Sequence, residues 1–138
     1  MTIGVIACGN TKRTEPARAQ DLYVGPLFRA YRAWITGNCD RWVILSAKHG
    51  VLEPDQVIEP YDVTLKRLNA RQLASWYINV RWQLCRMFND AFYLVLGGAR
   101  YRTALDVFPH SYPMAGLADM RFGKQLGWLK RNPVWSPT

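Results

Sequence analysis

The sequence lacks several motifs that would fix its class at once. Neither glycine-rich nucleotide fingerprint, GxGxxG or GxxxxGK[ST], occurs in its 138 residues. There is no CxxC pair, and the cysteines Cys8, Cys39 and Cys85 are widely spaced, which disfavours a structural zinc site. The absences exclude the common dinucleotide-binding and P-loop motifs, and we expect neither a metal nor another cofactor.

The chain also lacks any apolar run long enough to span a membrane and any signal-peptide pattern at its N-terminus. We therefore expect no membrane partner and a cytoplasmic location. Hydrophobic residues make up 49% of the chain, which is enough to build a core. We predict one α/β domain over residues 1–138, with residues 132–138 forming an irregular tail.

Acidic residues are scarce. Ten Asp and Glu stand against eighteen Lys and Arg, which gives a net charge of +8. A basic balance favours polyanionic partners, so nucleic acid, DNA first, or a nucleotide is the expected partner. The alternative is a basic soluble protein whose cations only cover a solvated surface.

Short apolar runs alternate with helical patterns, which is typical of an α/β layer fold. The predicted strands cover residues 2–7, 42–45, 92–96 and 111–115. The predicted helices cover residues 26–36, 70–88, 99–107 and 122–130, with one helical turn at 16–20. We expect residues 51–64 and 116–121 to be irregular, and Trp34, Trp76 and Trp82 to belong to the core.

Small and polar residues follow three of the predicted strands. Right-handed crossovers bring the carboxyl ends of parallel strands to one edge, where ligands bind. The sequence therefore predicts a pocket lined by Cys8, Gly9, Asn10, Ser46, Lys48, His49, Gly97 and Gly98. The Gly97-Gly98 pair fits either close approach of an anionic ligand or simply a tight turn.

Asp21, Glu59, Asp62 and His49 are the candidate catalytic residues. A carboxylate beneath a sugar can stabilise the oxocarbenium-like charge that develops when a nucleoside loses its base. His49 can stabilise the departing base anion or act as an acid or base. The structural alternatives are carboxylates paired with arginine and a loop histidine satisfied by the backbone.

Aromatic and basic residues complete the predicted site. Tyr23 and Tyr61 can stack on a base, or can be partly buried packing rings. Lys12 and Arg102 can contact phosphate. In the same hypothesis Asn10 and Ser46 read the edge of the base.

Four segments are similar to a known group of proteins. ACGNTK, PARAQDLYVGPLFR, WVILSAKHGVLEPDQVIEPYDVTL and GKQLGWLK resemble a small family of bacterial and phage domains of unassigned function, over about residues 3–131. That family distantly resembles the uracil-DNA-glycosylase-like superfamily, together with YaaA-type proteins and domains attached to tRNA deazaguanine-modifying enzymes. The resemblance implies a three-layer α/β/α fold with a short, mainly parallel four-stranded sheet.

The same resemblance implies an activity on nucleic acid or nucleobases, such as excision of modified bases in phage–host conflict. The sequence departs from the superfamily pattern in two places. The only segment similar to a GQDPYH-like loop is Glu59-Pro60-Tyr61-Asp62, and it follows the second strand instead of the first. The sequence also has no late HPS-type loop. These departures concern the catalytic residues more than the fold.

The first hypothesis is a metal-independent, DNA glycosylase-like enzyme that hydrolyses the N-glycosidic bond of a modified nucleobase after base flipping. A non-catalytic nucleic-acid-binding module is the second, and an enzyme or sensor for a free nucleotide or nucleoside is the third.

Overall fold

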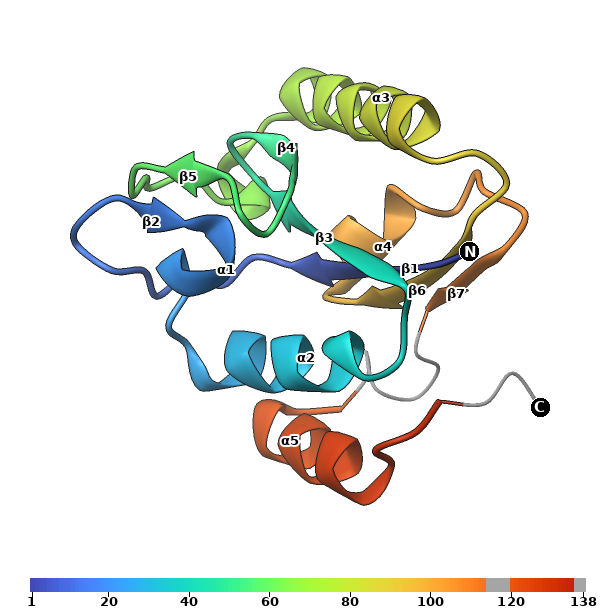
Figure 1. Cartoon of the computed structure of the whole chain (residues 1–138). Coiled ribbons are helices and arrows are strands. Elements are labelled where there is room, and N and C mark those ends of the chain that lie inside the picture. Colours follow the sequence, from blue (N-terminus) through green and yellow to red (C-terminus); the bar gives the residue numbers. More distant parts are fainter. Residues whose placement is uncertain (114–119, 136–138) are drawn as a thin grey trace.

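The structure is a computed structural model and describes residues 1–113 and 120–135 (Figure 1). Its strands are β1 (Thr2–Ala7), β2 (Ala17–Arg18), β3 (Arg41–Ser46), β4 (Gly50–Leu52), β5 (Val57–Ile58), β6 (Phe92–Leu96) and β7 (Ser111–Pro113). Its helices are α1 (Ala19–Leu22), α2 (Pro26–Thr36), the 3-10 helix η1 (Leu65–Arg67), α3 (Ala70–Met87), α4 (Ala99–Thr103) and α5 (Phe122–Arg131).

A mostly parallel sheet forms the centre of the fold, in the strand order β4-β3-β1-β6-β7. Neighbours among β3, β1, β6 and β7 are parallel, and β4 pairs antiparallel with β3 at the edge. Ala7 is level with Leu45, and Ile6 is level with Leu96. The carboxyl ends of β1, β3 and β6 therefore lie at the same edge of the sheet, and the predicted α/β class is confirmed.

Helices lie on both sides of this sheet, with α3 on one side and α2 on the other, and α5 packs against α2 (Figure 1). Side chains alternate along each central strand to supply both sides. Ile3 and Val5 join the cluster that contains Trp76 of α3. Ile6 joins the cluster that contains Ile35 of α2. Burial on both faces explains why these strands are almost uninterrupted apolar runs in the sequence.

The two long helices form where the sequence predicts them. Pro26 occupies the first turn of α2, where its missing N–H costs nothing, and Gly37 follows the last residue. Asn69 caps α3 and forms a reciprocal capping box with Gln72. The starts of both helices can be predicted from the sequence because each start is encoded within a few residues.

Two predictions about the connecting segments are wrong. The predicted turn at 16–20 lies instead at Ala19–Leu22, because Ala17–Arg18 is a strand paired with Val57–Ile58. Residues 51–64 are not irregular throughout, since they contain β4 and β5. β2 and β5 pair across about forty residues, which leaves no local periodicity in the sequence. β4 follows a reversal of the chain, which Gly50 allows with its φ of 75°.

Other predictions need smaller corrections. The sheet gains a fifth strand because β4 was missed. The helix predicted at 99–107 ends at Thr103. Trp34 and Trp76 are buried, but Trp82 is 58% exposed, on the side of α3 that faces away from the sheet. Residues 114–119, which include the end of the fourth predicted strand, and residues 136–138 of the tail lie outside the described residues.

None of the helices in the described part of the chain has the length and apolar character needed to cross a membrane.

Candidate functional site

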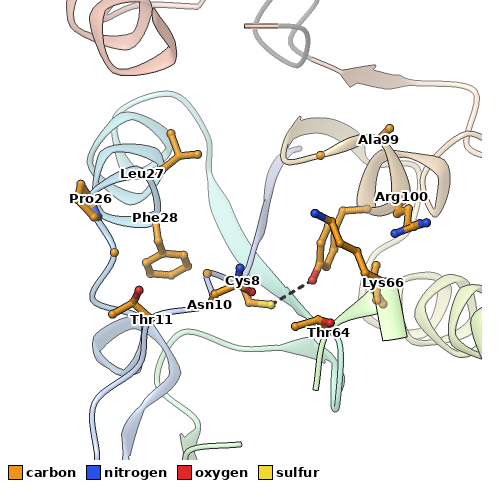
Figure 2. A pocket seen from close by; sticks show the side chains of 15 residues that line it. Cys8, Asn10, Thr11, Pro26, Leu27, Phe28, Thr64, Lys66, Ala99 and Arg100 are labelled. Carbon is orange, nitrogen blue, oxygen red and sulfur yellow. Dashed lines mark hydrogen bonds between the residues drawn. The ribbon is translucent and has the colours of Figure 1, made fainter. Parts of the chain in front are cut away.

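A cavity of about 710 Å³ opens beside the carboxyl ends of β1 and β6 (Figure 2). Its volume lies within the range of small-molecule binding sites. Its walls are made by Cys8, Gly9, Asn10, Thr11, Gly25, Pro26, Leu27, Phe28, Thr64, Leu65, Lys66, Gly98, Ala99, Arg100 and Tyr101. The position agrees with the general rule for ligand sites in open parallel sheets.

Four segments build the cavity. The chain leaving β1 forms one wall, and the first turn of α2, Pro26–Phe28, forms the next. The start of η1 and the first turn of α4 form the remaining walls. Figure 2 shows Phe28 and Thr11 facing Lys66 and Ala99 across the hollow. Much of the wall is apolar, which suits a flat or partly hydrophobic ligand.

The charge on the cavity wall has one sign. Lys66 and Arg100 are its charged residues, and the described lining contains neither Asp nor Glu. Both cations are exposed to solvent. In Figure 2 the Lys66 side chain extends toward the centre of the hollow, and Arg100 lies at its margin. The wall therefore suits a ligand that carries an anionic group.

Cys8 and Tyr101 form a polar pair at the floor of the cavity. The Cys8 Sγ and Tyr101 Oη atoms are 3.4 Å apart and share a hydrogen bond, drawn as the dashed line in Figure 2. Burial raises the pKa of Tyr101, and the neighbouring Cys8 thiol raises it further. The Tyr101 hydroxyl is therefore neutral at physiological pH and remains able to donate a hydrogen bond.

The two glycines after β6 differ in what surrounds them. A Cβ at Gly97 would stand 2.7 Å from the Cβ of Ala7, so Gly97 is required for close packing of β6 on β1. A Cβ at Gly98 would meet nothing within 4 Å. Gly98 lines the cavity and Gly97 does not. Close packing therefore requires Gly97, and only Gly98 of the pair borders the cavity.

The end of β3 is closed by a hydroxyl cluster, which we define as Tyr23, Ser46 and Tyr61. Ser46 Oγ donates to Tyr61 Oη at 2.7 Å, and the Tyr61 and Tyr23 hydroxyls are 2.6 Å apart. Ser46 Oγ also accepts the amide N–H groups of Lys48 and His49 at 3.2 and 3.1 Å. Burial raises the pKa of both tyrosines, so the cluster is neutral.

Lys12 and His49 cover the Tyr61 ring. The Lys12 ammonium lies 4.5 Å from the ring centroid, in cation–π geometry. The His49 ring meets Tyr61 edge-on, with centroids 5.4 Å apart. Burial and the charge of Lys48 lower the pKa of His49. His49 Nε2 is buried, and it has no hydrogen-bond partner among the described residues.

Asp21, a predicted catalytic residue, is part of an ion-pair network. Its carboxylate accepts from Arg18 at 2.9 Å and from Arg32 at 3.1 Å. Burial acts to raise the pKa of Asp21, but the two arginines outweigh it and lower the pKa below its ordinary value. Arg32 also donates to the backbone oxygen of Gln20, so the network holds α1 against α2.

The other two candidate carboxylates are exposed. Asp62 lies 3.4 Å from Arg67, with 85% of its side chain exposed. Glu59 is exposed as well. Neither of them lines the cavity.

Only some of the predicted site residues line the cavity. Cys8, Gly9, Asn10 and Gly98 line the cavity. The predicted residues that do not line it are Lys12, Asp21, Tyr23, Ser46, Lys48, His49, Glu59, Tyr61, Asp62, Gly97 and Arg102. Arg102 follows the lining residue Tyr101 in α4, and its Nε is buried without a partner among the described residues.

Several cavity residues were missed by sequence reasoning. Pro26, Leu27 and Phe28 carry a usable signal, because a helix start that follows a strand end faces the same edge of the sheet. Thr64–Lys66 carry none, because their approach depends on the path of the long segment after β5. Within residues 1–113 and 120–135, no cluster of three His, Cys, Asp or Glu residues could hold a metal ion.

Comparisons with known proteins identify the family of the chain. Residues 3–131 match the family of unknown function DUF6884. The uncharacterized protein YfjM of Bacillus subtilis (strain 168) is 34% identical over 110 residues, which cover 74% of this chain and 73% of that protein. No solved structure matches significantly. Because the family match covers almost the whole chain, the protein belongs to the family DUF6884.

Proposed function

We propose that the cavity binds a single nucleotide, either free or extruded from a nucleic-acid strand. One observation carries this proposal: a cavity of about 710 Å³ combines an apolar wall with two cations and no carboxylate in its described lining. A nucleotide has the complementary parts, a flat base and an anionic phosphate. The net charge of +8 favours the same ligand.

The two parts of the ligand have different partners in the cavity. The base contacts the apolar wall at Leu27 of α2, and the Asn10 amide and the Tyr101 hydroxyl of α4 can meet its polar edge. The phosphate lies toward Lys66 and Arg100. Tyr23 and Tyr61 are not available for stacking in this arrangement, since Tyr23 is 1% exposed and Lys12 covers Tyr61.

Base excision is a second candidate, and the sheet favours it. Support comes from the mostly parallel sheet, because the resemblance to the uracil-DNA-glycosylase-like superfamily implies a mainly parallel sheet. An extruded nucleotide would occupy the same cavity. The geometry gives this candidate less support than binding alone, because Asp21, Glu59 and Asp62 do not line the cavity.

Calorimetric titration with nucleoside monophosphates and with short single-stranded oligonucleotides tests the binding proposal. Lys66→Glu is expected to weaken binding of either ligand about tenfold or more, because it places a like charge beside the phosphate. Lys130→Glu, on the exposed end of α5, is the charge-matched control and is expected to bind normally. Absence of binding to both ligand types, or equal losses in the two variants, would refute the proposal.

A separate assay addresses excision. Duplexes with and without modified bases are incubated with the protein and then treated with alkali to cleave abasic sites. Abasic product that disappears in Lys66→Glu supports excision in this cavity. Nucleotide binding without any abasic product leaves the binding proposal standing and removes the second candidate.

A further inference from the structure

The side of α3 that faces away from the sheet carries large apolar side chains that take no part in the core. Ile78 is 67% exposed and Trp82 is 58% exposed, one helical turn apart. The opposite side of the same helix already buries Trp76, Val80 and Leu84. Folding therefore does not need the outer pair, which is costly to leave in water.

Arginines stand at the two ends of this apolar pair. Arg71 precedes it and Arg86 follows it at helical spacing, so both project from the outer side. We define Arg71, Ile78, Trp82 and Arg86 as the outer α3 face. Arg71 and Arg86 are separated by about 22 Å along the helix axis, at 1.5 Å per residue. The Arg86 guanidinium lies over the Trp82 ring, 4.7 Å from its centroid.

The helix has no acidic residue between Ala70 and Met87. Its remaining arginine, Arg81, is half-buried and lies toward the end of α4, because its guanidinium donates to the backbone oxygens of Thr103 and Ala104. The outer α3 face is therefore an apolar centre with positive ends and no negative group of its own helix to balance them. Its charge is complementary to a surface with an apolar centre and negative ends.

We propose that the outer α3 face docks an acidic amphipathic helix of a partner protein. Apolar side chains of that helix contact Ile78 and Trp82, and its carboxylates pair with Arg71 and Arg86. Tryptophan and arginine are among the residues most enriched at the energetic hot spots of protein interfaces. The surface lies outside the cavity lining and does not depend on the proposed nucleotide.

Two other occupants fit the face less well. Two like charges on each face and a net charge of +8 oppose pairing with a second copy of the chain. A nucleic-acid strand places phosphates along its whole length, whereas this face has cations only at its ends and Ile78 at its centre.

The test selects binders to the intact protein from a displayed library of random peptides, each of about 18 residues, long enough to span the face as a helix. The proposal expects enriched peptides that are acidic and carry apolar residues at helical spacing. Trp82→Ala is expected to weaken them roughly thirtyfold, as for a central interface residue. Arg86→Glu is expected to weaken them too, and changing the peptide's facing Glu to Arg is expected to restore binding.

Matched controls separate this result from others. Because Trp82 and Ile78 are exposed, their alanine variants are expected to keep the wild-type circular dichroism and thermal midpoint. Lys130→Glu controls for a general charge effect. The proposal is overturned if no peptide is enriched, or if the enriched peptides lack acidic residues. Two further results would overturn it, each with peptide binding left intact by Trp82→Ala. One is loss of self-association in sedimentation, and the other is loss of oligonucleotide binding.

Discussion

The carboxyl ends of β1 and β3 are neighbours at one edge of the sheet, yet their surroundings differ. Beyond β1, Cys8 to Thr11 line an open cavity with exposed cations nearby. Beyond β3, the Ser46 hydroxyl is fully buried and makes hydrogen bonds to Tyr61 and to the amides of Lys48 and His49. The open end borders a hollow that a ligand can enter, whereas at the closed end the Ser46 hydroxyl holds the chain through its hydrogen bonds.

The difference shows that convergence of strand ends does not by itself make a binding site. Polar residues at a strand end can form hydrogen bonds with one another instead of with a ligand. The segment that carries Tyr61 closes the end of β3 in this way. Substitutions at the closed end are therefore expected to change stability first. Substitutions at the open end are expected to change binding first.

The largest expected effect is at Ser46. Ser46→Ala removes the acceptor of two partly buried amide N–H groups and the donor to Tyr61, and we expect a loss of about 3 kcal/mol in the free energy of unfolding. Urea denaturation followed by circular dichroism measures it. The exposed Ser75→Ala is the control, expected within about 0.5 kcal/mol of wild type. An equally small loss at Ser46 would mean that the β3 end is not held by this hydroxyl.

The two adjacent glycines after β6 allow an effect on packing to be compared with an effect on binding. Gly97→Ala forces a Cβ to within 2.7 Å of Ala7, and we expect it to destabilise the fold by about 2 kcal/mol. At Gly98 the backbone φ is −67°, and an added Cβ meets no atom within 4 Å. Gly98→Ala is therefore expected to change the free energy of unfolding by less than about 0.5 kcal/mol. Because Gly98 lines the cavity, its variant is expected to weaken nucleotide binding instead. Equal stability losses would contradict this division.

Much of the fold could be predicted from the sequence because its signals are local. The buried runs at β1, β3 and β6, the proline that begins α2 and the Asn69 cap of α3 each lie within a few residues. Parallel pairing then follows from the alternation of strands and helices. The short strands β2 and β5 were missed because they pair with each other across about forty residues. β4 was missed although its partner β3 is adjacent, because three residues are too few to show an alternating pattern.

The site was predicted less completely for a related reason. Cys8, Gly9, Asn10 and Gly98 follow strands directly, so topology alone places them at the cavity. Whether Asp21 meets a ligand or Arg32 depends on side-chain partners that residue type does not reveal. Lys66 reaches the cavity through the path of a segment with little regular structure, which no periodic pattern encodes.

Asp21 is expected to contribute a moderate stability effect that depends on pH. Its pKa is lowered in the folded state, so its stabilisation is present above its ordinary pKa of 3.8 and is lost as pH falls through the lower folded value. Asp21→Asn is expected to cost about 1 kcal/mol near neutral pH, with a smaller difference from wild type in strong acid. Asp106→Asn, an exposed carboxylate, is the control. A loss of nucleotide binding without a loss of stability would restore a catalytic or binding role to Asp21.

The smallest expected effect is the titration of His49 at the closed end. Burial and Lys48 lower the pKa of His49 in the folded state, so the unfolded chain takes up a proton first as pH falls below 6.5. Stability is therefore expected to decrease as pH falls from 6.5 through the lower folded pKa, and to decrease less in His49→Gln. Urea midpoints measured across this range test the difference, with His110→Gln as the control because His110 lies far along the chain, stacked on Phe92. His49→Gln could instead leave the pH dependence of the urea midpoint unchanged and alter nucleotide binding. His49 would then belong functionally to the open cavity, and the separation between the two strand ends would not hold.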